Sequence, residues 1–131
     1  MFTSYLFLEG SLFLICIGGF FQVSQFLRLH GAVTTAGDLD DFKRMVRVNM
    51  YVALVYIVLG IPSILLSMYL SFAYGIYGMV IAIGATVPHF FLGKHMKKLD
   101  ERSRNLECSS RLDSEYKRIG QVWRKKALPD F

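Results

Sequence analysis

The chain has 131 residues, enough for one domain, and 53% of them are hydrophobic, a share too high for an average soluble domain. Fifteen Lys and Arg against ten Asp and Glu give a formal net charge of +5, but no nucleic-acid-binding motif accompanies this excess, so we predict no nucleic acid partner. Two cysteines without a C-x-x-C pair and three scattered histidines argue against a disulfide framework and a zinc site.

Three apolar blocks, residues 5–27, 48–70 and 72–93, are nearly free of charge. A helix of just over twenty residues is about 30 Å long, which matches the hydrocarbon thickness of a bilayer. We therefore predict an all-α membrane protein with a transmembrane domain of three helices in residues 1–93 and a basic tail in residues 94–131.

The first block lacks Lys and Arg before residue 28 and has no cleavage site, so we expect a retained helix rather than a signal peptide. Glu9, its only charged residue, is predicted about one turn inside the outer boundary. An acid inside a membrane is a functional hypothesis by default. Ion handling, or an ion pair with a partner, is therefore weighed against simple snorkelling to water, which a shallow position favours.

The orientation follows from the positive charges, which occupy only the first connection and the region from Lys94 onward. The positive-inside rule then places the N-terminus outside and the C-terminus in the cytoplasm. We expect a bacterial or organellar inner membrane.

The connection after the first block is expected to become helical before the second block. Asp38 is a candidate N-cap, and Leu39, Phe42 and Met45 recur at helical spacing. We predict one helix from about Leu39 to Leu70, with Phe42 and Met45 facing lipid or a partner.

The second and third blocks are joined by a short turn, which predicts a tight antiparallel hairpin. Small residues at helical spacing let membrane helices approach closely, so they predict the hairpin interface; a pore or ligand cleft is the weaker alternative. The predicted interface residues are Asn49, Ala53, Tyr56, Gly60, Ser63 and Ser67 in one helix and Gly75, Gly78, Ala82, Ala85 and His89 in the other.

Polar residues of the predicted bundle include Gln22, Gln25, Asn49 and His89, which lie at a similar distance from the charged loops. We interpret them as a cluster that holds the helices together or contacts a partner subunit, with a binding site as the alternative. His89 is the one histidine within a span, and a single histidine is weak support for haem. No cofactor is predicted, and His30 and His95 are interpreted as solvated.

The tail is expected to continue the third helix to about Asn105 and to form a second helix after Ser110, whose spacing to Asp113 resembles a capping box. Its apolar stripe is narrow and surrounded by basic residues, which favours contact with lipid headgroups or a cytoplasmic protein. The predicted partner-binding residues are Leu112, Tyr116, Ile119, Trp123 and Arg124.

No nucleophile with a base, paired acids or histidine cluster is visible, so we predict no enzymatic activity. The small size and the stripe around Trp123 favour an accessory, scaffold or assembly subunit of a larger membrane complex, bound to a polytopic subunit. The alternative is a small homo-oligomeric channel or transport protein that uses Glu9 and the polar residues of the bundle.

Overall fold

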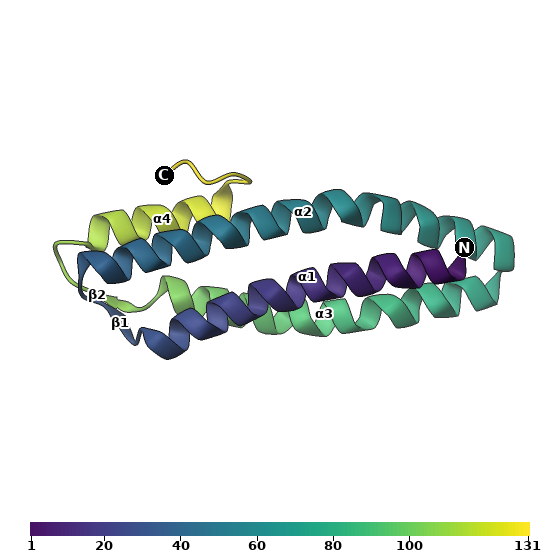
Figure 1. The fold of residues 1–131 in the computed structure, drawn as a ribbon, viewed down its shortest axis with the longest axis horizontal. Helices are drawn as coiled ribbons and strands as arrows, with labels where there is room; N and C mark the ends of the chain where they lie inside the picture. Colours follow the sequence, from purple (N-terminus) through teal and green to yellow (C-terminus); the bar gives the residue numbers. More distant parts are fainter.

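The computed structural model describes all 131 residues as a bundle of long helices. The elements in chain order are α1 (Phe2–Leu29), β1 (Ala32–Val33), α2 (Ala36–Tyr74), α3 (Ile76–Arg104), β2 (Glu107–Cys108) and α4 (Asp113–Lys125). Helices hold 83% of the residues, which confirms the all-helical class. In Figure 1, α1, α2 and α3 run side by side, and α4 lies against one end of α2.

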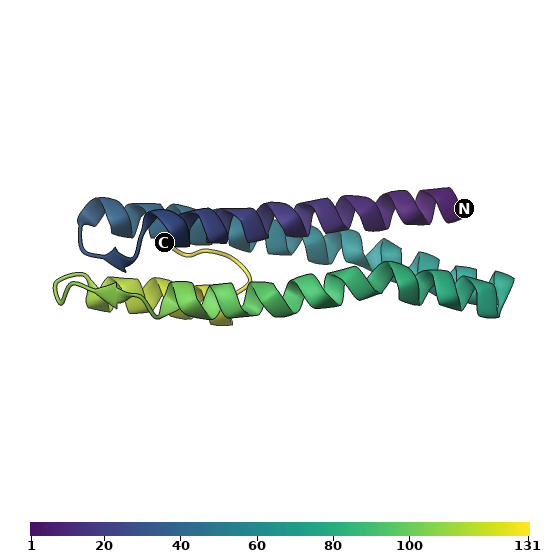
Figure 2. The same cartoon turned by 90° about the horizontal axis from the view of Figure 1, so that it is seen from below.

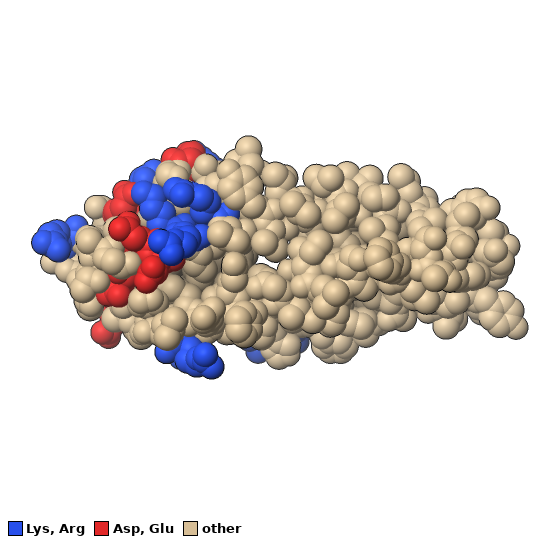
Figure 3. All heavy atoms as spheres, in the orientation of Figure 1, with Lys and Arg blue, Asp and Glu red and all other residues tan.

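Three of the helices, α1, α2 and α3, are long and apolar enough to cross a membrane, as predicted. Lys, Arg, Asp and Glu gather at one end of the bundle in the view of Figure 3. We call residues 23–50 and 94–131 the charged end, and residues 1–22 and 51–93 the apolar end. Glu9 is the one charged side chain of the apolar end.

The α2–α3 turn consists of a single residue, Gly75, between Tyr74 and Ile76. Its φ of +56° lies in the region that side chains with a Cβ avoid, so glycine permits the reversal. Gly78 then lets the two backbones meet, because a Cβ there would lie 2.1 Å from the carbonyl oxygen of Leu70. The predicted tight hairpin is thus formed at the apolar end.

The start of α2 corrects the predicted cap. Thr35, not Asp38, is the N-cap, and Asp38 is the third helical residue that completes a capping box with it. The helix begins at Ala36, before the predicted Leu39, because this reciprocal pair satisfies backbone N–H groups that Asp38 alone would leave open.

A hydrophobic core fills the charged end and includes α4. Its ten buried residues come from α1, β1, α2 and α4. Phe42 of α2 is fully buried, with ring centroids 4.8 Å from Tyr116 and 5.6 Å from Phe26. The face of α2 that we expected to meet lipid or a partner therefore meets α4 and α1.

Two connections are tied together beside this core. Ala32 pairs with Glu107 and Val33 with Cys108 in a parallel two-stranded ladder, and Figure 2 shows the two strands next to each other. The predicted Ser110 cap is wrong, because α4 begins at Asp113 without a side-chain cap. The first backbone hydrogen bond of α4 runs from the Tyr116 N–H to the carbonyl oxygen of Leu112.

Candidate functional site

Glu9 lies deeper in the bundle than we predicted. Its carboxylate accepts a hydrogen bond from the Ser63 hydroxyl, and Ser63 lies eleven residues before Tyr74 and fifteen after Val48. At 1.5 Å per residue this is about 16 Å from the turn. The α2–α3 hairpin extends past the N-terminus in both Figure 1 and Figure 2, so Glu9 lies farther from that end of the bundle than its place in α1 indicates; its depth in a membrane stays a prediction.

Four polar side chains from all three long helices meet at this depth. The Oε2 atom of Glu9 lies 3.1 Å from Nε2 of His89, and the Tyr56 hydroxyl lies 3.0 Å from Nδ1 of the same ring. The carboxylate is out of line with the ring N–H direction, so the contact is an ion-pair contact rather than a straight hydrogen bond. We call Glu9, Ser63, His89 and Tyr56 the mid-bundle cluster.

The surroundings of the mid-bundle cluster are mostly apolar. Phe13 packs edge-on against the His89 ring at 5.5 Å, and the side chains of Glu9 and His89 are only 10% and 11% exposed. Hollows of about 250 and 230 Å³ border both residues. A charge buried in a protein interior without a partner costs several kcal/mol. Glu9 therefore needs the partners that it contacts.

The arrangement suits the binding and movement of a proton. One nitrogen of His89 contacts the Tyr56 hydroxyl and the other contacts the Glu9 carboxylate. The imidazole ring therefore lies between the Tyr56 hydroxyl and the Glu9 carboxylate and brings the three helices into one polar chain. Ser63 donates to the other carboxylate oxygen of Glu9.

No family model, curated protein or solved structure matches this chain. The interpretation of function therefore depends on the positions of its side chains.

The predicted cluster of Gln22, Gln25, Asn49 and His89 does not form. His89 joins the mid-bundle cluster, whereas the Asn49 amide donates to the carbonyl oxygen of Gly19 at 3.2 Å. Gln25 is exposed, and the buried Oε1 of Gln22 has no hydrogen-bond partner. Similar distance from the charged loops did not bring these residues together, because α1 and α3 are offset along the bundle axis.

The predicted small-residue interface is divided between two neighbours. Near the turn Gly78 packs on Leu70 as expected, but Ser63 faces α1, and a Cβ on Gly60 would meet nothing within 4 Å. The Tyr5 hydroxyl donates to the carbonyl of Ala82 at 3.5 Å, so α1 occupies part of the face that we assigned to α2. The remaining positions are exposed Ala53 and Gly75 and half-buried Ser67 and Ala85.

The tail stripe packs within the chain. Tyr116 and Ile119 are buried in the charged-end core, and Leu112 and Trp123 pack against it, while Arg124 stays exposed. Tyr116 also donates to the carbonyl of Ser103, and burial raises the pKa of its hydroxyl. The predicted partner surface is therefore reduced to the outer edge of α4.

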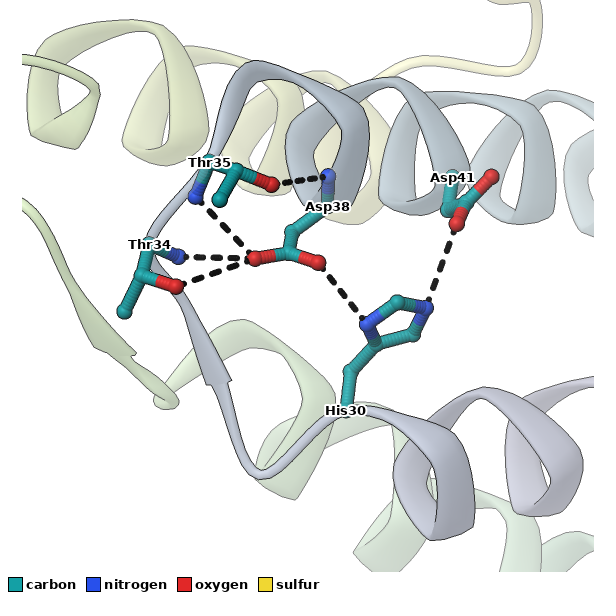
Figure 4. Close-up of polar contacts among 5 residues, drawn as sticks. All are labelled: His30, Thr34, Thr35, Asp38 and Asp41. Carbon is teal, nitrogen blue, oxygen red and sulfur yellow. Dashed lines mark hydrogen bonds and ion pairs between the residues drawn. The ribbon is translucent and has the colours of Figure 1, made fainter.

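A second polar cluster links α1 to α2 at the charged end (Figure 4). His30, which we expected to be solvated, lies 3.1 Å from Asp38 and 3.2 Å from Asp41. The N–H groups of Thr34 and Thr35 donate to Asp38 and lower the pKa of its carboxyl from 3.8 to about 2. This cluster explains the sharp turn between the helices and needs no ligand.

Proposed function

We propose that this chain is a non-catalytic subunit of a larger integral membrane complex, to which it contributes a proton-binding pair inside the bilayer. The contact of 3.1 Å between Glu9 and His89, on neighbouring helices of the apolar end, is the observation that supports this most. Ionisable residues at such depth are costly and commonly belong to proton or ion pathways.

The role as a subunit is supported by what surrounds the pair. The apolar end has no second charged side chain that would continue a path for ions. The two hollows beside Glu9 and His89 are open on the bundle surface. A helix of a larger polytopic subunit that fills either hollow would contact the pair and complete such a path.

The proposed orientation places the charged end in the cytoplasm and the N-terminus outside, in a bacterial or organellar inner membrane. Every Lys and Arg belongs to the charged end, which is the distribution that the positive-inside rule requires. The mid-bundle cluster would then exchange its proton with a neighbouring subunit rather than directly with the cytoplasm.

A homo-oligomeric channel or transport protein is the second candidate. The same open hollows favour it, because a helix from another copy of the chain could fill them and contact Glu9 and His89 as well as a helix from a different protein. The two proposals differ in whether the chain assembles with a different protein or with copies of itself.

The first test is purification of the tagged chain from its native membrane in mild detergent, followed by a native gel and mass spectrometry. Stoichiometric recovery of a larger membrane protein is the expected result. Recovery as a homo-oligomer that moves ions in liposomes in a Glu9-dependent way would establish the second candidate instead.

The proton-binding pair has its own test. Infrared difference spectra of the purified protein between acidic and alkaline pH should contain a carboxyl stretching band that Glu9→Gln removes. Glu101→Gln, at an exposed position of the charged end, should leave this band unchanged. A spectrum identical in wild type and Glu9→Gln would overturn proton binding.

A further inference from the structure

A groove of about 420 Å³ lies where α2, α3 and the end of α4 meet, at the border between the apolar and charged ends. Ala53, Leu54 and Ile57 of α2 form its apolar wall. Lys97 of α3 and Lys126, which follows α4, line it toward the charged end, and the ammonium group of Lys126 also pairs with Asp130. One continuous surface thus offers a hydrocarbon-like half and a cationic half.

Arg104 is the cation of this half that packs against α4. This residue lines the groove, and its guanidinium lies 5.4 Å from the centre of the Trp123 ring. Its side chain also passes close to Gly120, where a Cβ would meet the Arg104 Cγ atom at 3.5 Å. A second hollow of about 530 Å³ shares Lys97 and Arg104 and adds Arg124 and one acid, Glu101, so cations outnumber acids on the surface that continues outward.

Asp100 is the one acid of the groove, and its Oδ1 atom is buried without a hydrogen-bond partner. Burial raises the pKa of its carboxyl to about 6. A buried acceptor without a donor is costly. A ligand that carries a hydroxyl donor as well as a negative charge would satisfy Asp100 and the cations together.

We infer that this groove binds one anionic phospholipid with a hydroxyl-bearing headgroup, for which phosphatidylglycerol is the simplest case. The phosphate lies among Lys97, Arg104 and Lys126, and a headgroup hydroxyl donates to Asp100. An acyl chain follows the apolar wall of α2. Charge complementarity and the position of the groove at the border of the apolar end support this occupant, and neither depends on proton binding at Glu9.

The only tryptophan of the chain, Trp123, lines the groove and provides the test. Phosphatidylglycerol with brominated acyl chains should quench its fluorescence saturably in the detergent-solubilised full chain, and brominated phosphatidylcholine should not. The double variant Lys97→Gln/Lys126→Gln should need roughly thirtyfold more lipid, because each nearby lysine contributes about 1 kcal/mol.

The matched control is Lys94→Gln/Lys125→Gln. It removes the same charge from α3 and α4, at exposed positions that do not line the groove. Its quenching midpoint should stay near that of wild type. An equal loss in both double variants, or equal quenching by phosphatidylcholine, would overturn the site in favour of general surface attraction.

Two further variants separate the parts of the proposal. Gly93 lines the groove and a Cβ there would meet nothing within 4 Å, so Gly93→Leu fills the groove without displacing a neighbour and should weaken binding. Asp100→Ala should reduce phosphatidylglycerol binding to the level of phosphatidic acid, which lacks the headgroup hydroxyls. Unchanged phosphatidylglycerol binding in both variants would contradict the assigned position of the lipid.

Discussion

The two ends of this molecule are built in opposite ways. At the charged end apolar side chains such as Phe42 and Ile119 are fully buried, and the charges lie outside. At the apolar end Phe72 is 89% exposed and Tyr77 is 77% exposed, while Glu9 is buried. One chain thus has a large hydrophobic core at one end, and exposed apolar side chains around a buried acid at the other.

The difference follows from the solvent that each end suits. In water the burial of apolar area drives packing. In hydrocarbon that drive between helices is absent, so close backbone contacts and polar pairs hold helices together. Phe42 illustrates the first case, and the mid-bundle cluster and Gly78 illustrate the second.

The sharpest test of this contrast compares two phenylalanines. Phe42→Ala should lower the free energy of unfolding by about 3–5 kcal/mol, because it leaves a cavity in a packed core. Phe72→Ala, on the exposed surface of the apolar end, should change it little. Denaturant titration in mild detergent, followed by circular dichroism, measures both, and equal losses would show that the two ends do not differ.

The next largest effect is expected at the mid-bundle cluster. His89→Ala leaves Glu9 without its nitrogen partner and should cost about 1–3 kcal/mol, as for other buried groups that lose a partner. A double-mutant cycle with Glu9→Gln should give a coupling energy well above zero, measured in the same titration. Additive effects would mean that the contact contributes nothing to the bundle.

The cap of α2 should have a smaller effect at the charged end. Thr35→Ala removes the hydroxyl that accepts from the Asp38 N–H and should cost about 1 kcal/mol. Thr34→Ala removes only a hydroxyl donor to the Asp38 carboxylate, so it is the matched control. We expect Thr35→Ala to be the more destabilising, and the reverse order would contradict the assigned cap.

The smallest predicted effect depends on pH. Because the pKa of Asp38 is lowered from 3.8 to about 2 in the folded chain, its ionised form stabilises the fold. This contribution is present above about pH 4 and is lost as the pH falls toward about 2. Asp38→Asn should therefore reduce the fall in unfolding midpoint between these pH values, whereas Asp40→Asn, at an exposed position, should not.

Much of the fold could be predicted from the sequence. Block length and the absence of charge gave the three long helices, and the short connection gave the hairpin at Gly75. The docking of α4 was missed although Leu39, Phe42 and Met45 were recognised as one apolar face and the stripe around Ile119 as another. Either face alone indicates only that it is covered by something apolar. The two faces cover each other because both lie at the charged end of the bundle.

The candidate site was only partly predictable. Glu9, Ser63 and His89 were each noted, but their meeting depends on how far α1 is offset along α2 and α3. Helix lengths leave that offset free, because it is set by side-chain contacts such as that of Tyr5 with Ala82. The partner of Glu9 therefore could not be found from counting residues inward from the span ends.

The short ladder between β1 and β2 has a mechanical consequence. It fastens the segment that leaves α1 to the segment that leaves α3, through the pairs Ala32 with Glu107 and Val33 with Cys108. The bundle is thus fixed at one end by backbone pairing, whereas at the other end α1 is held to α2 and α3 by side-chain contacts. A rearrangement of Glu9 and His89 would rotate α1 about the β1–β2 ladder. The displacement would be largest at the N-terminus and smallest beside α4.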